Sequence, residues 1–503
     1  MVHRVALLAL GLLAAVVLAA PGARAGGFEY ELQGANTVAR AGANVAHVED
    51  PSTLYLNVAG IGKLDDVQIL LDLNLVDVDS AVTIGGNLVD SWEVSGVEYP
   101  YMTVENDDPV FPGPMIAASF GIPGVEGLVL GLGVFGPAAV GNYTYDVWVE
   151  PEGGVRVPGP QRYDLIREKV LFYWPTVAIA YRILPGLVVG AGFQWGILDF
   201  EYEVAGSIAT VRNPGSWQSD FLASVHALDW FVPAGLVGVS WQPLPWLEAG
   251  LSLRLSGKVE AKSKKTEVVV NAWMGDDAVS SNDPTLDWMD AYERPHGNVS
   301  FAWPLLKLRT GVRFALPRGD VKAPEDGGPV PAHLREWFDV ELAFFLETSG
   351  QVDAIDMRLD GFAPYDRAPG SVIPLNPTED GLFSTERGWK HCWSLRLGGD
   401  VNLWDGHISL GWGVFFDRGA APEAYTRLDY MAFDRWGLST GIVGRFWKLE
   451  VRFSYAHFFY PRRVVTDGAI THLQATGTEG TVINNGTYEA SIDVFTVGVA
   501  ARF

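Results

Sequence analysis

The sequence has little cysteine, no long apolar segment beyond its first residues, and few basic residues. Its single cysteine, Cys392, excludes an intramolecular disulfide and with it the disulfide-stapled class of secreted domains. Beyond residue 25, no apolar run approaches the roughly 20 residues that a membrane-spanning helix requires. The 36 basic residues face 60 acidic ones, and the net charge of −24 argues against nucleic acid as a partner, because its phosphates need a basic surface.

Residues 1–25 have the features of a cleaved signal peptide. His3 and Arg4 precede an apolar run over residues 5–20, and Ala23-Arg24-Ala25 is a small-x-small cleavage site. Loss of this leader would leave 34 basic and 60 acidic residues, a net charge of −26. We interpret the excess acid as solvated loops, with divalent-cation bridging to anionic surface lipid as the alternative.

Aromatic residues are abundant for a secreted protein, with 18 Trp, 17 Tyr and 25 Phe in a chain that is 48% hydrophobic. From residue 65 onward, apolar residues alternate with small or polar ones, which is the period of a β-strand. Leu306 and Leu308, for example, share one strand face, whereas Lys307 and Arg309 share the other. Alternating strands rich in aromatics and glycine are typical of an outer-membrane barrel, with apolar side chains toward lipid.

The alternation predicts fourteen strands, an even number that brings both ends of a barrel chain to one side. They are residues 67–82, 115–121, 128–146, 170–182, 187–204, 236–242, 247–259, 305–316, 337–348, 389–402, 407–417, 435–446, 448–460 and 490–503. Short connections follow alternate strands, whereas residues 205–235 and 260–304 are long and polar, which predicts periplasmic turns opposite external loops. The long connection 317–336 is the exception, on the side of the short turns.

The segment between leader and strands, residues 26–64, is rich in Gly and Ala and too small to form its own core. We therefore expect a signal peptide (1–25), an enclosed hatch (26–64) and a barrel (65–503). The stretches GANTVARAGA (34–43) and DPSTLYLNVAG (50–60) resemble the N-terminal hatch of the FadL/TodX family of outer-membrane transporters for long-chain fatty acids and hydrocarbons. Val58 stands where that family usually has proline.

The resemblance implies an all-β fold, a transmembrane antiparallel β-barrel of about 14 strands with a small N-terminal helical hatch inside the lumen. It also implies a monomer in the outer membrane of a Gram-negative bacterium, surrounded by outer-membrane lipid, that passively transports long-chain fatty acids or other hydrophobic small molecules. A closed barrel with a surface-binding or structural role is the alternative; a hatch would block the water-filled pore of a general porin. We expect external loops to capture the ligand through Trp217, Phe221, Trp230, Phe231, Trp273, Trp288 and Met289.

A Gly-Pro pair interrupts the third predicted strand at Gly136 and Pro137. Proline lacks the N–H that a sheet ladder uses and glycine offers no packing surface, so the pair predicts a bulge or kink. In the resembled family, a kink in this strand makes a lateral opening into the bilayer. We therefore predict a lateral opening at Phe135, Gly136 and Pro137; alternatively, the strand simply ends at Gly136 and resumes at Asn142.

The second candidate site is the hatch segment Asn57, Val58, Ala59 and Gly60. The resemblance implies that this segment helps to shape the channel and shifts when ligand binds. Without the family proline, its backbone regains a free φ angle and an N–H donor. A gate is the prediction, and a plain contact with the wall is the alternative.

The third candidate is a set of basic residues on lumenal strand faces: Lys307, Arg309, Arg313, Arg396, Arg445 and Arg452. An Arg among them could bind the carboxylate of a fatty acid in bidentate fashion. The same faces carry Asp339, Glu341, Glu347, Asp400 and Glu450, so a neutralising ion-pair network is the alternative.

An enzymatic function is not expected. The 9 His residues include no pair at metal-ligand spacing, and no serine lies in a nucleophile-elbow motif. The strand glycines alternate with apolar residues instead of opening a helix, which excludes a phosphate-binding loop. We therefore predict no catalytic residues, no metal site and no cofactor.

Overall fold

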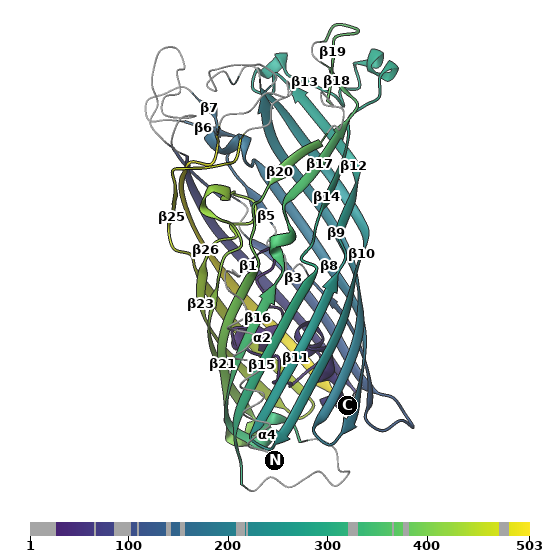
Figure 1. Cartoon of the computed structure of the whole chain (residues 1–503), viewed down its shortest axis with the longest axis vertical. Coiled ribbons are helices and arrows are strands. Elements are labelled where there is room, and N and C mark those ends of the chain that lie inside the picture. The colour runs from purple at the N-terminus through teal and green to yellow at the C-terminus, as the bar shows by residue number, and fades with distance from the viewer. Residues whose placement is uncertain are drawn as a thin grey trace.

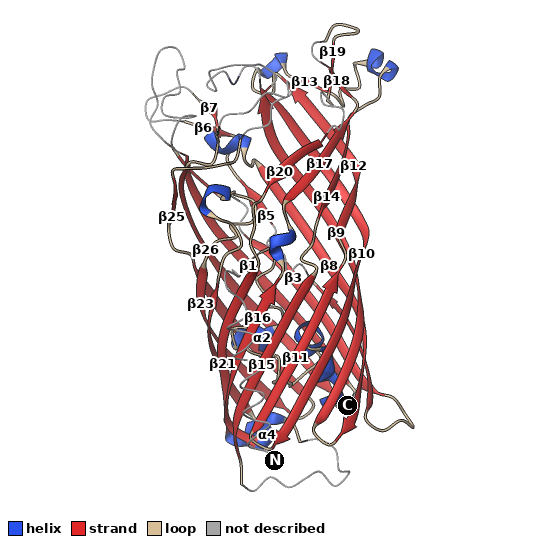
Figure 2. Ribbon diagram, in the orientation of Figure 1, coloured by secondary structure: helices blue, strands red, loops and turns tan. Residues whose placement is uncertain are grey.

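The computed structural model describes residues 27–64, 67–84, 102–107, 110–136, 142–150, 156–207, 217, 220–319, 330–364, 367–375, 382–471 and 482–503 (Figure 1). The predicted leader lies outside these ranges. Most of the described residues are strands that wind around a tall barrel (Figure 2).

Fourteen strands of the described residues form a closed antiparallel ring. In ring order they are β1 (Gln68–Ile84), β3 (Val110–Gly121), β4 (Leu128–Phe135), β8 (Arg167–Leu184), β9 (Leu187–Ser207), β10 (Asp220–Leu244), β11 (Leu247–Ser256), β15 (Leu306–Pro317), β16 (Glu336–Glu347), β21 (Cys392–Leu403), β22 (Ile408–Asp417), β23 (Arg435–Phe446), β24 (Leu449–Phe459) and β26 (Gly486–Arg502). The last strand pairs back onto the first, from Gln68 opposite Arg502 to Ile84 opposite Gly486. The predicted barrel is confirmed.

The remaining elements lie mostly at the upper end in Figure 1. Shorter strands are β2 (Thr103–Glu105), β5 (Asn142–Thr144), β6 (Trp148–Val149), β7 (Val157–Pro158), β12 (Val259–Val270), β13 (Val279–Ser280), β14 (His296–Phe301), β17 (Ala354–Asp360), β18 (Phe362–Pro364), β19 (Val372–Pro374), β20 (Leu382–Glu386) and β25 (Arg463–Val465). Short helices are η2 (Pro160–Tyr163), η4 (Gly275–Asp277), η5 (Asp287–Ala291), η6 (Ser349–Gln351), α4 (Ala332–Arg335), η7 (Trp404–Gly406) and η8 (Glu423–Tyr425). Within the described residues, no helix has the length and apolar character needed to cross a membrane.

The wall carries polar side chains inside and apolar ones outside. On β15, Lys307, Arg309 and Arg313 are 3%, 1% and 1% exposed, whereas Phe314 and Leu316 are 44% and 59% exposed. A soluble barrel would reverse this pattern. The exposed apolar face therefore suits a barrel surrounded by lipid.

Two predicted external loops are partly wrong. Residues 205–235 are predicted as a loop, but β10 begins at Asp220 and pairs with β9 from Ser207 onward. Residues 260–304 contain β12, β13 and β14, which extend the wall upward beside β10. In these upper segments the apolar side chains face inward and the polar ones face outward. This is the reverse of the pattern in the membrane, where apolar side chains face outward. A search for strands with an outward apolar face therefore missed them.

The aromatic residues predicted for ligand-capturing loops are also placed differently. Trp230 and Phe231 lie on the outer face of β10, 64% and 48% exposed, and Phe221 is buried on the same strand. Trp273 and Met289 are buried at the upper end. These five residues are therefore not exposed together in one loop, and a role in ligand capture stays a prediction.

The hatch lies inside the lumen (Figure 1). It contains α2 (Ala35–Ala39), α3 (Thr53–Leu56) and the 3-10 helix η1 (Val58–Lys63). Nearly every residue from 27 to 64 is buried, including the charged ones. Helices this short do not persist alone, so contacts with the wall hold the segment in place.

Glycines of the wall make room for the hatch backbone. A Cβ atom at Gly190 of β9 would lie 2.8 Å from Ala59 Cα, and one at Gly250 of β11 would lie 2.6 Å from the Val45 carbonyl carbon. Further glycines contact residues 39–41 in the same way: Gly398, Gly413 and Gly441. Because packed cores leave no slack for such overlaps, side chains at these positions would push the hatch off the wall.

Gly238→Val on β10 is expected to loosen the hatch, because an added Cβ would lie 2.9 Å from Ala59 N. Overpacking of this kind costs about 1–3 kcal/mol. Gly235→Val on the same strand is the matched control, since nothing lies within 4 Å of a Cβ there. Limited proteolysis of the purified barrel should cleave the hatch faster in Gly238→Val alone; equal cleavage in both variants would contradict the close fit.

Candidate functional site: a clamped hatch and an interrupted wall

The first hatch residues are held by a buried cluster of charges. Lys307 of β15 pairs with Glu29 and Glu31 of the hatch and lies 2.8 Å from Glu347 of β16. Arg309 Nη2 lies 2.8 Å from Glu31 Oε2. All five side chains are buried, so each charge is compensated by a partner and not by water.

Arg40 anchors the middle of the hatch to β16 and β21. Its guanidinium lies 2.7 Å from Asp339 Oδ1 and also pairs with Asp400. In return, the carboxylate of Glu341 on β16 accepts three successive hatch N–H groups, those of residues 45, 46 and 47, at 2.7, 3.0 and 2.9 Å. Successive N–H groups converging on one anion form a strong, directional contact.

The last part of the hatch is held from the C-terminal strands. Arg452 of β24 lies 2.7 Å from Asp50 Oδ2, and Arg445 of β23 lies 3.3 Å from Glu49 Oε2. His333 of α4 contacts the same Glu49 oxygen through Nδ1 at 2.8 Å. Burial alone would raise the pKa of Glu49, but His333 and Arg445 together hold that pKa well below its usual value.

The six predicted lumenal cations are all buried beside carboxylates: Lys307, Arg309, Arg313, Arg396, Arg445 and Arg452. Arg313 lies 3.1 Å from Asp339 Oδ2, and Arg396 lies 2.8 Å from Asp417 Oδ1. Their role in binding a ligand stays a prediction. The geometry favours the alternative, a neutralising network, because each cation already has a carboxylate partner.

The predicted gate, from Asn57 to Gly60, packs against the wall. The Asn57 amide nitrogen donates to the carbonyls of Val45 (2.9 Å) and Val239 of β10 (3.1 Å). The Asn57 Oδ1 atom accepts from Ala59 N at 3.2 Å and so caps η1. The segment therefore makes a wall contact, and its movement on ligand binding stays a prediction.

Among the described residues, the ladder between β3 and β8 has an interruption where β4 ends. β4 pairs with β8 up to Phe135, opposite Trp174, and pairing with β8 resumes at Asn142 of β5. Residues 110–114 of β3 pair with β1 on one edge, and residues 170–173 of β8 pair with β9 on one edge. On their other edges, which face each other, the described residues provide no partner strand. Within the described residues, the predicted strand 128–146 corresponds to β4 and β5, and residues 137–141 between them lie outside the described ranges.

Two of the three residues predicted for the lateral opening border this interruption, and Pro137 lies outside the described residues. Phe135 is buried, with its ring centroid 5.6 Å from that of Tyr55 in the hatch. A Cβ at Gly136 would lie 2.5 Å from the Pro114 carbonyl oxygen, so β3 leaves room only for glycine there. An exit role for the interruption stays a proposal.

The interruption is lined by apolar side chains. Facing inward, β8 contributes Val170, Phe172 and Trp174 and β3 contributes Phe111 and Met115, each no more than 2% exposed. On the outer face, an apolar groove of about 440 Å³ is lined by Ile116, Leu132, Val134, Val177, Phe193 and Trp195, among others. This environment contrasts with the charged lumen around the hatch.

Sequence reasoning missed Asn106, which bridges the upper end of the interruption. Its amide nitrogen donates to the carbonyls of Val78 on β1 (2.9 Å) and Asn142 on β5 (3.3 Å). Its Oδ1 atom accepts from Thr144 N at 2.9 Å. An isolated asparagine in a polar connection carries no periodic signal, so nothing in the sequence marked it.

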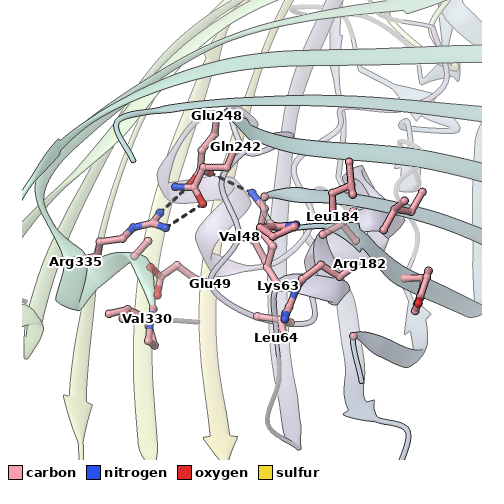
Figure 3. Close-up of a pocket in the computed structure, with 18 of the residues that line it drawn as sticks. Val48, Glu49, Lys63, Leu64, Arg182, Leu184, Gln242, Glu248, Val330 and Arg335 are labelled. Atoms are coloured by element: carbon pink, nitrogen blue, oxygen red, sulfur yellow. Dashed lines mark hydrogen bonds and ion pairs between the residues drawn. The ribbon is translucent and has the colours of Figure 1, made fainter. Parts of the chain in front are cut away.

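A polar cavity of about 870 Å³ lies beneath the hatch (Figure 3). Lys63 of the hatch and Arg335 of α4 converge on Glu248 of β11, with N–O distances of 3.2 and 2.7 Å. Arg335 also donates to Gln242 Oε1 at 3.3 Å. An apolar molecule that left the barrel downward would have to cross this charged space.

Lys307→Met is expected to cost about 3–5 kcal/mol of unfolding free energy, because Glu347 would stay buried without a cation and Glu29 and Glu31 would keep only Arg254 and Arg309. Lys265→Met is the control: its partner Glu267 lies 3.0 Å away, but Lys265 is 65% exposed, and exposed pairs contribute only about 0–1 kcal/mol. Urea unfolding of the two variants in lipid vesicles measures the difference. Equal unfolding midpoints would show that the cluster does not hold the hatch.

Acid should weaken hatch docking through His47. Burial, together with Arg40 and Arg313, lowers its pKa well below the usual 6.5, although Asp339 and Glu49 oppose this. The unfolded chain therefore binds the proton more readily, and stability falls by up to about 1.4 kcal/mol per pH unit as pH drops below about 6.5. Hatch proteolysis at pH 7.5 and 5.5 should accelerate less in His47→Gln than in wild type or in a control variant, His226→Gln on the outer wall. An unchanged acid response in His47→Gln would contradict this assignment.

Comparisons with known proteins agree with the fold. No protein-family model matches the sequence, and no curated protein is detectably similar to it. A solved FadL homologue of Pseudomonas aeruginosa has a TM-score of 0.68 at 14% identity, covering 95% of this chain and 100% of that one. The toluene transporters TodX of P. putida and TbuX of Ralstonia pickettii have TM-scores of 0.59 and 0.57, each at 12% identity over 94% of this chain and 99% of theirs.

The printed names of TodX and TbuX describe them as toluene transporters. The similarity spans nearly the whole chain. By its fold, the chain is therefore a FadL/TodX-type β-barrel, as the resemblance of its hatch segments implied.

Proposed function

We propose that this barrel passively transports hydrophobic small molecules across the outer membrane and releases them sideways through the wall. The observation that carries the proposal is the interruption between β3 and β8, bordered by Phe135 and Gly136 and apolar on both faces. Apolar lining on the lumenal side suits an apolar ligand, and the outer groove suits the acyl chains of a bilayer.

The alternative path, straight down the lumen, is less favourable. The hatch fills the lumen and is fixed by buried ion pairs, including those of Lys307 and Arg452. Below it lies the charged cavity around Glu248. An apolar molecule that entered this space would lose contact with apolar surroundings. Each Å² of apolar surface left in polar surroundings costs roughly 25 cal/mol of free energy.

The gate role of Asn57 to Gly60 fits this path. Tyr55, two residues before Asn57, contacts Phe135 at the lower edge of the interruption. A small movement of the hatch would therefore shift Tyr55 against Phe135 and change the shape of the exit. Ligand would move down its concentration gradient, since no described element resembles an energy-coupling site.

The ligand class that the lumen suits best is neutral and apolar. The cations that could bind a carboxylate, Lys307 and Arg309 among them, are already paired with hatch acids, so a fatty acid would have to displace one of those pairs. The relatives TodX and TbuX are named as toluene transporters. We therefore place aromatic hydrocarbons ahead of long-chain fatty acids as ligands.

Gly113→Trp tests the exit. Gly113 is buried on β3, opposite Asn74 of β1, and its other edge faces the interruption, so an indole there would fill the lumenal side of the opening. Gly235→Trp on the exposed face of β10 is the control. In cells that lack their own transporter, uptake of labelled toluene should fall at least about tenfold in Gly113→Trp and stay at wild-type level in Gly235→Trp, as expected when bulk blocks a pocket.

Membrane level and folding are checked by the heat-modified gel mobility of each barrel. Uptake by wild type that persists in folded Gly113→Trp would exclude lateral release. A folded wild-type barrel that takes up neither toluene nor labelled fatty acid would support the closed-barrel alternative. Uptake of fatty acid alone would reverse the order of ligands given above.

A further inference from the structure

The outer wall carries a concentrated patch of positive charge in an otherwise acidic protein. Four lysines lie within eight residues at the start of β12: Lys258, Lys262, Lys264 and Lys265. All four are exposed, in a chain whose net charge is −24. We call these residues the lysine patch.

The patch is only partly neutralised by its neighbours. Lys258 pairs with Glu260, and Lys265 lies 3.0 Å from Glu267 Oε2. Among the described residues, no carboxylate lies within ion-pair distance of Lys262 or Lys264. Three acids of β9 lie beside this part of β10 and have partners of their own. Asp199 lies 2.7 Å from His226 Nε2, Glu201 lies 3.1 Å from Arg167 Nη2, and Glu203 accepts from Ser224 Oγ at 2.9 Å. The patch therefore keeps an excess of positive charge.

A β-bulge places two aromatic rings directly below the patch. The pairing of β9 with β10 shifts between Asp229 and Val232, which turns both Trp230 and Phe231 outward. Asp229 fixes this bulge: its Oδ1 accepts from Phe231 N at 2.9 Å, and its Oδ2 accepts from Glu260 N of β12 at 2.7 Å. Bulges held in this way are used to re-aim side chains.

The register shows which group lies higher on the wall. Lys262 and Lys265 pair with Leu228 and His226, which lie above Trp230 on β10, toward the end of the barrel that carries the long connections. The Lys264 ammonium lies 5.6 Å from the Trp230 ring centroid. Below the rings the outward residues are apolar, as at Val237. The rings thus mark the upper edge of the apolar band, where aromatic girdles meet the headgroups.

We propose that the lysine patch and Trp230 bind a phosphorylated glycolipid of the outer leaflet, with its phosphates on the lysines and its acyl chains against Phe231 and the apolar wall. Charge complementarity at headgroup level supports this occupant, since each Lys near an anionic membrane surface adds attraction. The flexible lysine stems can follow the wall while their ammonium groups reach the phosphates. The inference rests on the barrel lying in the outer membrane and not on transport.

Native mass spectrometry of the full barrel in detergent with EDTA, titrated with diphosphorylated lipid A, tests the proposal. EDTA removes divalent cations that could bridge phosphate to the acidic residues. Lys262→Glu with Lys264→Glu should weaken binding at least about tenfold, because two attractive charges become repulsive. Lys448→Glu, an exposed lysine at the opposite end of the barrel, is the matched control and should bind as wild type does.

Two further measurements test whether positive charge on the protein and phosphate on the lipid are both required. Lys262→Arg with Lys264→Arg should keep the affinity, and lipid A without phosphates should bind wild type as weakly as the Glu variant binds lipid A. Full binding by the folded Glu variant, or an equal loss in Lys448→Glu, would overturn the site. Displacement of lipid A by millimolar inorganic phosphate would overturn the lipid assignment and leave a site for free anions.

Discussion

Compensation of buried charge is the constraint on which the rest of this structure depends. A barrel in lipid must turn its apolar side chains outward, so the polar ones of strands such as β15 collect inside. There Lys307 and Arg309 lie almost without water, and an unpaired buried ion costs several kcal/mol. The hatch supplies the missing partners, Glu29 and Glu31, and in return receives acids for its own Arg40. Neither the hatch nor the wall is electrostatically complete without the other.

The same constraint separates polar from apolar regions within one lumen. Ion pairs fill the level of the hatch, and the cavity below it is lined by Lys63, Glu248 and Arg335. Apolar side chains collect instead beside the interruption at the end of β4, where no described residue pairs with the upper part of β3 or with residues 170–173 of β8 on that side. A hydrophobic molecule therefore meets least resistance at the side of the barrel, and this separation is the physical basis of the transport that we propose.

Glycine has a complementary role in this arrangement. At Gly190, Gly238 and Gly250 the wall has no side chain, and the hatch backbone lies directly against it. Long charged side chains on neighbouring strands then reach around the hatch to their partners. The outer wall differs from the lumen because its side chains face lipid and headgroups instead of the hatch. Trp230 and Phe231 mark the upper edge of the apolar band, and the lysines lie above them.

The sequence alone determined the barrel, its fourteen strands and the enclosed hatch, because alternation over β15 or β24 depends only on which residues neighbour each other along the chain. It also placed a strand breaker at Gly136, directly after the end of β4 at Phe135, since glycine and proline act on the backbone locally. It did not locate the upper part of β10, where water replaces lipid outside and the alternation reverses. Only the tertiary structure decided that Lys307 meets Glu29 and Glu31, and that Asn106 bridges β1 and β5. Such partners lie far apart in sequence and share no pattern, so only the closing of the barrel around the hatch brings them together.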